Sequence, residues 1–263
     1  MKTNISWLFY KNYFDGINWS DLKATTNVAT LKEKNAKIIQ SQLYKIDNPL
    51  ALHTFEMQVE YPGLVTGVGI NHEANLEGEF KLGLHFNYTY GMPVIYGSSV
   101  KGLLKSAFPN KNDKEDVRND KSKYIGKLLR KELKLGEVEK LCDWIFEGKE
   151  SGKPISIYGR DIFFDTVVIR SNKKERILES DSITPHKKQG MSYEESMLRN
   201  PIPITFMKIA SGVTMEFRFD LKSCNIGNVE ISADDKKRLF KAILLDFGIG
   251  AKTNVGYGQF SEI

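Results

Sequence analysis

A glycine-rich segment near the C-terminus, GIGAKTNVGYG (residues 248–258), carries the residue types that bind phosphate groups. Glycines leave backbone N–H groups accessible, so such a segment can form a concave nest for an anion. Lys252, Thr253 and Asn254 add side-chain donors, and Gly250 and Tyr257 belong to the same candidate site. The alternative is a tight turn without a ligand, because glycine supplies positive φ whether or not an anion is bound.

The order of elements excludes the common nucleotide-binding loops. A P-loop or dinucleotide fingerprint places its glycines after a strand and before a helix. Here a helix pattern precedes the glycines, with Ser232 as N-cap, Asp235 completing a capping box and Gly248 as a left-handed cap. Ala251 stands where a P-loop requires glycine, and Thr253 where the dinucleotide pattern requires glycine or alanine. ATP and NAD are therefore poor candidates.

A second candidate anion site lies in YGSSVKGLLKSAF (96–108). Its apolar spacing predicts a helix that Gly97, Ser98 and Ser99 cap. Lys101 and Lys105 fall one turn apart on the polar side. A cation near a helix N-terminus opposes the helix dipole unless an anion shares the site.

A third candidate lies in a polar stretch, residues 171–200, which is long enough to indicate a functional loop or projecting hairpin. It contains His186, Lys187 and Lys188 in the run TPHKK. The two lysines favour phosphate contact. General acid–base catalysis by His186 stays open, although the sequence shows no partner for it.

The remaining reactive side chains indicate structural roles. Histidines 53, 72 and 85 lie in strand or loop patterns, and Asp161, Asp165 and Asp181 are spaced as capping or solvated acids. Cys142 lies in an amphipathic helical stretch, which favours a buried thiol. The chain has neither a CxxC nor an HExxH pattern, so we expect no metal site and no cofactor.

Composition indicates a soluble globular protein. The chain has 263 residues, 41% of them hydrophobic, and a net charge of +5 from 38 basic and 33 acidic residues. We expect a cytoplasmic protein without a membrane partner, because no apolar run is long enough for a membrane span and the N-terminal segment is too polar for a signal peptide. This modest charge permits a nucleic-acid partner without requiring one.

The periodicity predicts alternating helices and strands. Helices are expected at 19–46, 97–108 and 232–247 and in a charged block at 109–153. Extended segments are expected at 53–61, 78–91, 159–169 and 255–263, with a hairpin at 202–221 that turns at 211–212. This is the split βαβ order of an α+β, ferredoxin-like (RRM-like) fold, and such sheets often present one face to single-stranded RNA. We expect a single domain over 1–263 with an N-terminal helical extension, about 1–50, and a helical insertion, about 109–153.

Four segments carry a family resemblance. GMPVIYGSSVKGLLKSAF resembles the segment after the first strand in the RAMP superfamily of CRISPR proteins. FGIGAKTNVGYGQF resembles that superfamily's glycine-rich loop, in the version typical of the sixth subunit of the Cmr (type III-B) effector complex, and DSITPHKK and NPIPITFMKI resemble the same subunit. The matches keep their order over roughly residues 50–263. Tyr96 departs from the pattern, which usually has proline there.

The resemblance implies a non-catalytic subunit that holds the 3′ part of a guide RNA and caps a filament of related subunits in antiviral defence. Its implied partners are the guide RNA (crRNA), the target RNA, a repeated backbone RAMP subunit, a terminal RAMP subunit and a small helical subunit. Two alternatives stay open. One is a RAMP endoribonuclease that processes CRISPR RNA, and the other is a filament subunit that contacts only proteins. The aromatic run SWLFYKNYF (6–14) could supply the apolar patch of the latter, or pack on the protein's own core.

Overall fold

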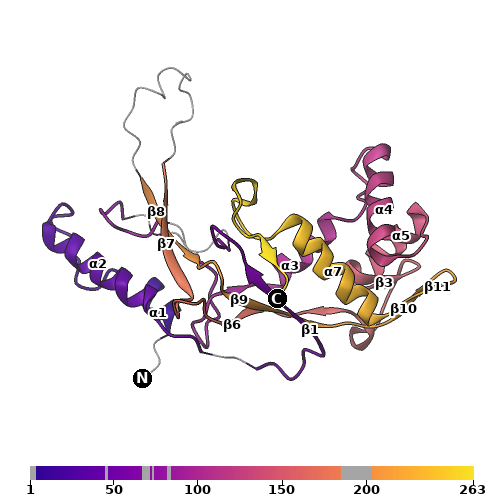
Figure 1. Cartoon of the computed structure of the whole chain (residues 1–263), viewed down its shortest axis with the longest axis horizontal. Coiled ribbons are helices and arrows are strands. Elements are labelled where there is room, and N and C mark those ends of the chain that lie inside the picture. The colour runs from indigo at the N-terminus through magenta and orange to yellow at the C-terminus, as the bar shows by residue number, and fades with distance from the viewer. Residues whose placement is uncertain (1–3, 45–46, 67–71, 73, 82–83, 185–202) are drawn as a thin grey trace, which may run out of the picture.

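The computed structural model describes residues 4–44, 47–66, 72, 74–81, 84–184 and 203–263. Its central sheet has the order β12–β1–β9–β6–β2, in which every neighbouring pair is antiparallel. β5 also pairs with β9. The bounds are β1 His53–Val59, β2 Val94–Ile95, β5 Ile162–Phe163, β6 Thr166–Arg170, β9 Thr214–Asp220 and β12 Phe260–Ser261. The chain is therefore an α+β protein (Figure 1).

Alternation along the strands gives the sheet one apolar face. On β1 the side chains of Phe55, Met57 and Val59 are buried, and Phe55 stacks on Phe217 of β9 at 5.2 Å between ring centroids. Helix α7 (Ala233–Phe247) packs against β1 and contacts α3 (Gly97–Ser106). The apolar face is thus the floor of the main core.

The opposite face is polar on the two central strands. There β1 and β9 present Glu56 and Glu216, which pair with Arg170 and Arg218 respectively. Neither strand presents an aromatic ring on this face, because the period of two sends Phe55, Phe217 and Phe219 to the core. This part of the sheet therefore lacks the stacking surface that the predicted RRM-like fold would offer to RNA.

Helix α7 begins where the sequence predicts. The Ser232 hydroxyl accepts the Asp235 N–H and the Asp235 carboxylate accepts the Ser232 N–H, both at 3.1 Å, so the capping box is confirmed. The helix ends at Gly248, which has a φ of 65° and a ψ of −174°. Because this ψ is extended, Gly248 does not form the left-handed cap that the sequence predicts. At α3 the N-cap is Tyr96, without a side-chain cap, so the predicted serine caps are wrong.

A two-stranded ribbon stands apart from the central sheet. It consists of β7 (Leu178–Ile183) and β8 (Ile204–Ile209), and in Figure 1 it projects beside α2. The predicted hairpin at 202–221 is wrong, because β8 pairs with β7 while β9 lies between β1 and β6. The turn at Gly212, with φ of 78°, instead links the ribbon to the sheet. Alternation indicated both strands correctly, but it holds no information about their partners.

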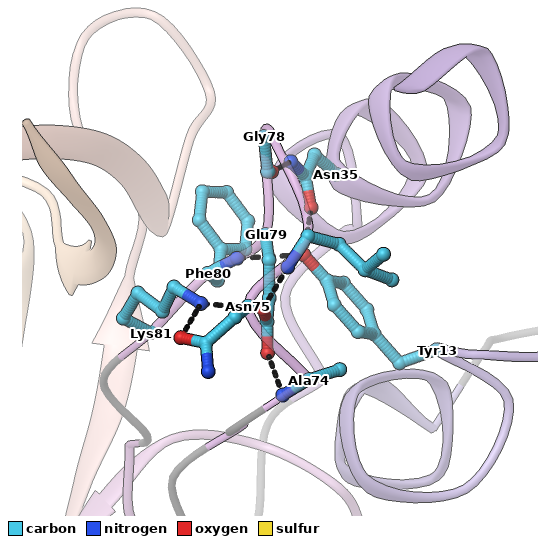
Figure 2. Close-up of polar contacts among 9 residues, drawn as sticks. Tyr13, Asn35, Ala74, Asn75, Gly78, Glu79, Phe80 and Lys81 are labelled. Atoms are coloured by element: carbon cyan, nitrogen blue, oxygen red, sulfur yellow. Dashed lines mark hydrogen bonds and ion pairs between the residues drawn. The ribbon is translucent and has the colours of Figure 1, made fainter. Parts of the chain in front are cut away.

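The N-terminal extension forms α1 (Ile5–Tyr10) and α2 (Thr25–Ile39). Phe9 and Tyr13 of the aromatic run are buried in the main core, whereas Trp7 is exposed. In Figure 2 the Tyr13 hydroxyl donates to Asn35 Oδ1 at 2.6 Å and accepts the N–H of Phe80 at 2.9 Å. The aromatic run therefore packs mainly on the protein itself.

Segment 74–81, which is hydrogen-bonded to Tyr13 through Phe80, also contacts the ribbon. Glu79 has a fully buried carboxylate that accepts the N–H groups of Ala74 and Leu76 and the ammonium of Lys81 at 2.7 Å (Figure 2). The N–H of Lys81 donates to the carbonyl of Thr205 on β8 at 2.9 Å. The extension thus braces the ribbon through segment 74–81.

The charged block 109–153 is mostly helical, as predicted. It contains α4 (Glu115–Leu129), α5 (Leu135–Cys142) and the π-helical turn η1 (Asp143–Glu147). Short elements complete the chain: β3 Lys149–Glu150, β4 Lys153–Pro154, η2 Ile157–Gly159, β10 Cys224–Ile226, β11 Val229–Ile231 and η3 Thr253–Val255. The predicted extended segment 78–91 shows a single bridge, between Phe86 and Pro93, within its described residues.

Candidate nucleic-acid interface

The glycine-rich loop lies against the segment that follows β1. The N–H of Ala251 donates to the Val65 carbonyl and the N–H of Gly258 donates to the Gly63 carbonyl, both at 2.8 Å. The N–H of Glu60 donates to the Gln259 carbonyl at 2.9 Å. Segments 60–65 and 251–259 are therefore held together by their backbones.

Gly250 is required by this contact. Its φ is 105°, and a Cβ built on it would lie 2.3 Å from the Val65 carbonyl oxygen. Gly250 belongs to the anion site that the sequence predicts, but the chain's own backbone occupies the space beside it. The tight-turn explanation therefore accounts for Gly250.

The tip of the loop retains the features of an anion nest. Lys252 has a left-handed φ of 62° and is followed by the 3-10 turn η3. The three consecutive N–H groups of Lys252, Thr253 and Asn254 have no acceptor among the described residues, and the Lys252 ammonium has no ion-pair partner there either. Asn254 is exposed, and Lys252 and Thr253 are half-buried. Consecutive free N–H groups beside a cation suit a phosphate oxygen.

Tyr257 has a different role from the one that we predicted. It is 7% exposed, its ring packs on Phe206, and its hydroxyl donates to Asp181 Oδ2 at 2.8 Å. Burial, together with the hydrogen bond to Asp181, raises the pKa of Tyr257 to about 12. The buried ring is not accessible to a base, so Tyr257 positions the loop against the ribbon.

Asp181 is shared between the loop and the ribbon. Lys208 of β8 donates to the same Oδ2 at 2.6 Å, and its side chain is nearly buried. Burial acts to raise the pKa of Asp181, but the hydrogen bonds from Lys208 and Tyr257 outweigh it and hold this pKa below its usual value. Asp181 is therefore an ionised structural group at neutral pH.

The start of α3 lines a second candidate site. The N–H of Gly97 donates to Asp165 Oδ1 at 3.0 Å, and a Cβ on Gly97 would lie 2.2 Å from the Phe163 carbonyl oxygen. Beside this contact is a pocket of about 340 Å³, lined by Gly97, Ser98, Lys101, Ile157, Arg160, Asp161, Ile162 and Phe163. Ser98 is exposed at its rim, whereas Ser99 is not among the lining residues.

This pocket carries an excess of positive charge. Lys101 and Arg160 form no ion pair among the described residues, and the Lys101 ammonium lies 5.8 Å from the centroid of the Phe163 ring. The one carboxylate in the lining, Asp161, is bonded to the buried ammonium of Lys236 at 2.8 Å. Arg160 could not be predicted as a site residue, because a single arginine after the insertion has no sequence pattern that links it to α3.

Lys105 lies apart from this pocket. It pairs with Glu147 of the insertion, and this hydrogen bond raises the pKa of Lys105. His186, Lys187 and Lys188 lie outside the described residues.

The structure does not bring the two anion sites together. Phe163, beside Gly97, pairs with Phe219 near the end of β9, whereas Val65 follows the end of β1 that pairs with Thr214 at the start of β9. Thr214 and Phe219 are five residues apart on β9, so about 17 Å of strand separates these levels. The glycine-rich loop and the α3 pocket are therefore two spatially separate candidate anion sites.

The other reactive groups are engaged in the fold. His53 Nδ1 accepts the Leu221 N–H, His85 stacks on Tyr96, and His72 is buried against Phe9, with a pKa lowered chiefly by burial. Both cysteines are buried, which raises the thiol pKa to about 12 at position 142 and about 11 at position 224. In the described part of the chain no cluster of histidine, cysteine and carboxylate side chains could hold a metal ion, and no helix there is long and apolar enough to cross a membrane.

The RAMP superfamily model matches residues 56–261, which is most of the chain. The chain belongs to the RAMP superfamily. The CRISPR system Cmr subunit Cmr6 of Pyrococcus furiosus is 25% identical over 235 residues, covering 76% of this chain and 65% of that protein. The chain thus spans slightly less than two thirds of the length of this relative.

Two solved structures match the chain at low sequence identity. A chain in the cryo-EM structure of the type III-B Cmr-beta complex bound to cognate target RNA matches with a TM-score of 0.52 and 22% identity, covering 97% of this chain and 84% of that one. The crystal structure of Pyrococcus furiosus Cmr6 aligns with 80% of this chain and 98% of that one, with a TM-score of 0.45 and 20% identity. The predicted resemblance to a Cmr-type RAMP protein is confirmed.

Proposed function

We propose that this RAMP protein is a non-catalytic subunit of a type III-B CRISPR effector complex that grips the backbone of the 3′ part of the guide RNA and caps the filament of related subunits. In this proposal its partners are the guide RNA, the target RNA and neighbouring RAMP and small helical subunits. The relatives support this setting, since they include a Cmr subunit and a Cmr complex with target RNA.

The observation that carries the proposal is the charge of the α3 pocket. Lys101 and Arg160 both line one cavity, and neither has an ion-pair partner among the described residues, although Arg160 Nε donates to the Ile155 carbonyl. Like charges that share a site are destabilising unless an anion joins them. A phosphate of an RNA backbone supplies that anion, and Ser98 adds a hydroxyl donor at the rim.

We extend the proposal to the fold and to the absence of catalysis. The order β12–β1–β9–β6, with α3 between β1 and β6 and α7 between β9 and β12, is the arrangement that a ferredoxin-like domain would have. General acid–base cleavage of RNA needs an accessible group, usually a histidine. The three described histidines are engaged in hydrogen bonds or ring contacts, which supports a binding role.

A binding assay with fluorescent single-stranded RNA tests the proposal. The full chain should retain the RNA uncleaved, with an affinity that falls steeply as salt rises. Lys101→Gln with Arg160→Gln should weaken binding about 10- to 100-fold. Lys105→Gln is the matched control, since Lys105 is already paired with Glu147 and should matter less.

The same assay separates the alternatives. Cleavage of the RNA that His186→Ala abolishes would overturn the non-catalytic assignment and favour an endoribonuclease. A subunit that contacts only proteins would be favoured by two results together. The isolated chain would not retain RNA, and the Lys101 and Arg160 substitutions would not change RNA retention by the assembled complex.

A further inference from the structure

The turn at Tyr61 lies directly beside the glycine-rich loop. Gly63 and Glu60, on either side of the turn, are hydrogen-bonded to Gly258 and Gln259. A Cβ built on Gly256 would lie 3.6 Å from Pro62 Cδ, in ordinary van der Waals contact. Tyr61 therefore precedes the proline that borders Gly256, the residue that ends η3, although almost two hundred positions separate Tyr61 from Gly256 in the sequence.

The Tyr61 side chain is 83% exposed on this backbone. The next residues are also fixed, because Leu64 exchanges backbone hydrogen bonds with Ile209 of β8 at 3.0 and 2.8 Å. A ring on a fixed turn loses little conformational freedom when a ligand covers it, since only its own two side-chain torsions must be ordered. The structure thus presents an accessible, pre-positioned aromatic face.

We propose that Tyr61 is a stacking platform for one base of single-stranded RNA whose phosphate binds at the tip of the glycine-rich loop. The inference rests on the proposed RNA-binding function and adds a base contact to it. Proteins that hold single-stranded RNA without sequence preference combine cations along the backbone with aromatic rings under the bases. Here Lys252 and the free N–H groups of 252–254 supply the phosphate contact, and Tyr61 supplies the ring.

The proposed base contact uses Tyr61, whereas the sequence suggested Tyr257. Tyr257, within the loop, is buried and bonded to Asp181, so it cannot stack on a base in this arrangement. Tyr61, which lies outside the glycine-rich segment, would stack on the base instead. A contact of this kind is indifferent to sequence, since every base has a π face.

The test compares two probes, a short oligouridylate and the same phosphodiester chain with abasic riboses. Tyr61→Ala in the full chain should weaken binding of oligouridylate about 5- to 100-fold and leave binding of the abasic probe unchanged. Lys252→Gln should weaken both probes. Tyr61→Phe should retain binding, whereas Tyr61→Leu, which keeps the apolar bulk without the π face, should lose it.

The outcomes separate this inference from the proposed function. Equal loss of both probes in Tyr61→Ala, or full affinity for oligouridylate in Tyr61→Leu, would overturn stacking while leaving phosphate binding in place. Failure of the wild-type chain to bind either probe would overturn both. Trp19→Ala, at another exposed aromatic, controls for a general effect of surface rings and should bind as the wild type does.

Discussion

Tyr257 donates its hydroxyl hydrogen bond to Asp181 at 2.8 Å and so joins the C-terminal loop to the β7–β8 ribbon across 76 positions of sequence. The ammonium of Lys208 reaches the same carboxylate oxygen. This three-residue contact fixes the orientation of the loop, and with it the direction in which Lys252 and the free N–H groups face.

Tyr257→Phe should destabilise the protein. It removes a hydrogen bond to an ionised carboxylate but keeps the ring, so the free energy of unfolding should fall by about 1–3 kcal/mol. Urea denaturation at pH 7 measures this change. Tyr158→Phe, which removes a hydroxyl from an exposed side chain, should leave the stability unchanged. Equal stability of Tyr257→Phe and the wild type would mean that the bond to Asp181 has no net effect on folding.

Asp181→Asn should destabilise the protein at neutral pH but much less in acid. The pKa of Asp181 lies below its usual value of about 3.9, so its ionised form is favoured by folding. That contribution is fully present above the unfolded-state pKa and is lost as pH falls through the lower folded-state pKa. The difference in unfolding free energy between wild type and variant, measured from pH 7 to pH 3, should therefore shrink below about pH 4. A constant difference would contradict the assignment of the shift to Asp181.

Gly250→Ala should lower the melting temperature whether or not the loop binds RNA. The added Cβ would meet the Val65 carbonyl oxygen at 2.3 Å, and a φ of 105° is strained for any residue with a side chain. Gly102→Ala is the matched control, since nothing lies within 4 Å of its Cβ position and it sits within α3. The control should gain about 0.5–1 kcal/mol from helix propensity. A melting temperature of Gly250→Ala at or above that of the wild type would disprove the close contact.

The buried pair of Lys236 and Asp161 should show strong coupling. Both side chains are fully buried, and the Lys236 ammonium also donates to the Lys222 carbonyl at 2.6 Å and lies 3.6 Å from the Trp144 ring centroid. Lys236→Met or Asp161→Asn alone leaves a buried charge without its partner, which typically costs about 3–5 kcal/mol. The double variant should cost less than the sum of the two, as a double-mutant cycle of unfolding free energies would measure. Additive effects would show that the two groups do not stabilise each other.

Much of the helical structure could be predicted from the sequence, because helix signals are local. The capping box of Ser232 and Asp235 and the apolar face of α7 depend on residues within a few turns. The helix of α3 was predicted, but Gly97, which was expected within its cap, is its first residue. The motifs around α3 and the glycine-rich loop likewise indicated the RAMP superfamily, since each is a short continuous run.

Strand partners could not be predicted in the same way. Residues 202–221 alternate on both sides of a glycine turn, which is the pattern of a hairpin, yet β8 joins β7 and β9 joins β1 and β6. A strand's partner is set by which long-range pairing buries most apolar surface, and alternation is the same for every such pairing.

The sequence by itself determined the residue types of the candidate site, its glycines, lysines and serines, and the family to which the chain belongs. Only the tertiary structure decided which of them are exposed and which are paired with other residues. In the folded chain Tyr257 is buried and Tyr61 is exposed, Lys105 is paired with Glu147, and Arg160 lines the same pocket as Lys101. The physical reason is that exposure and charge balance depend on neighbours far apart in the chain, which a local pattern does not contain.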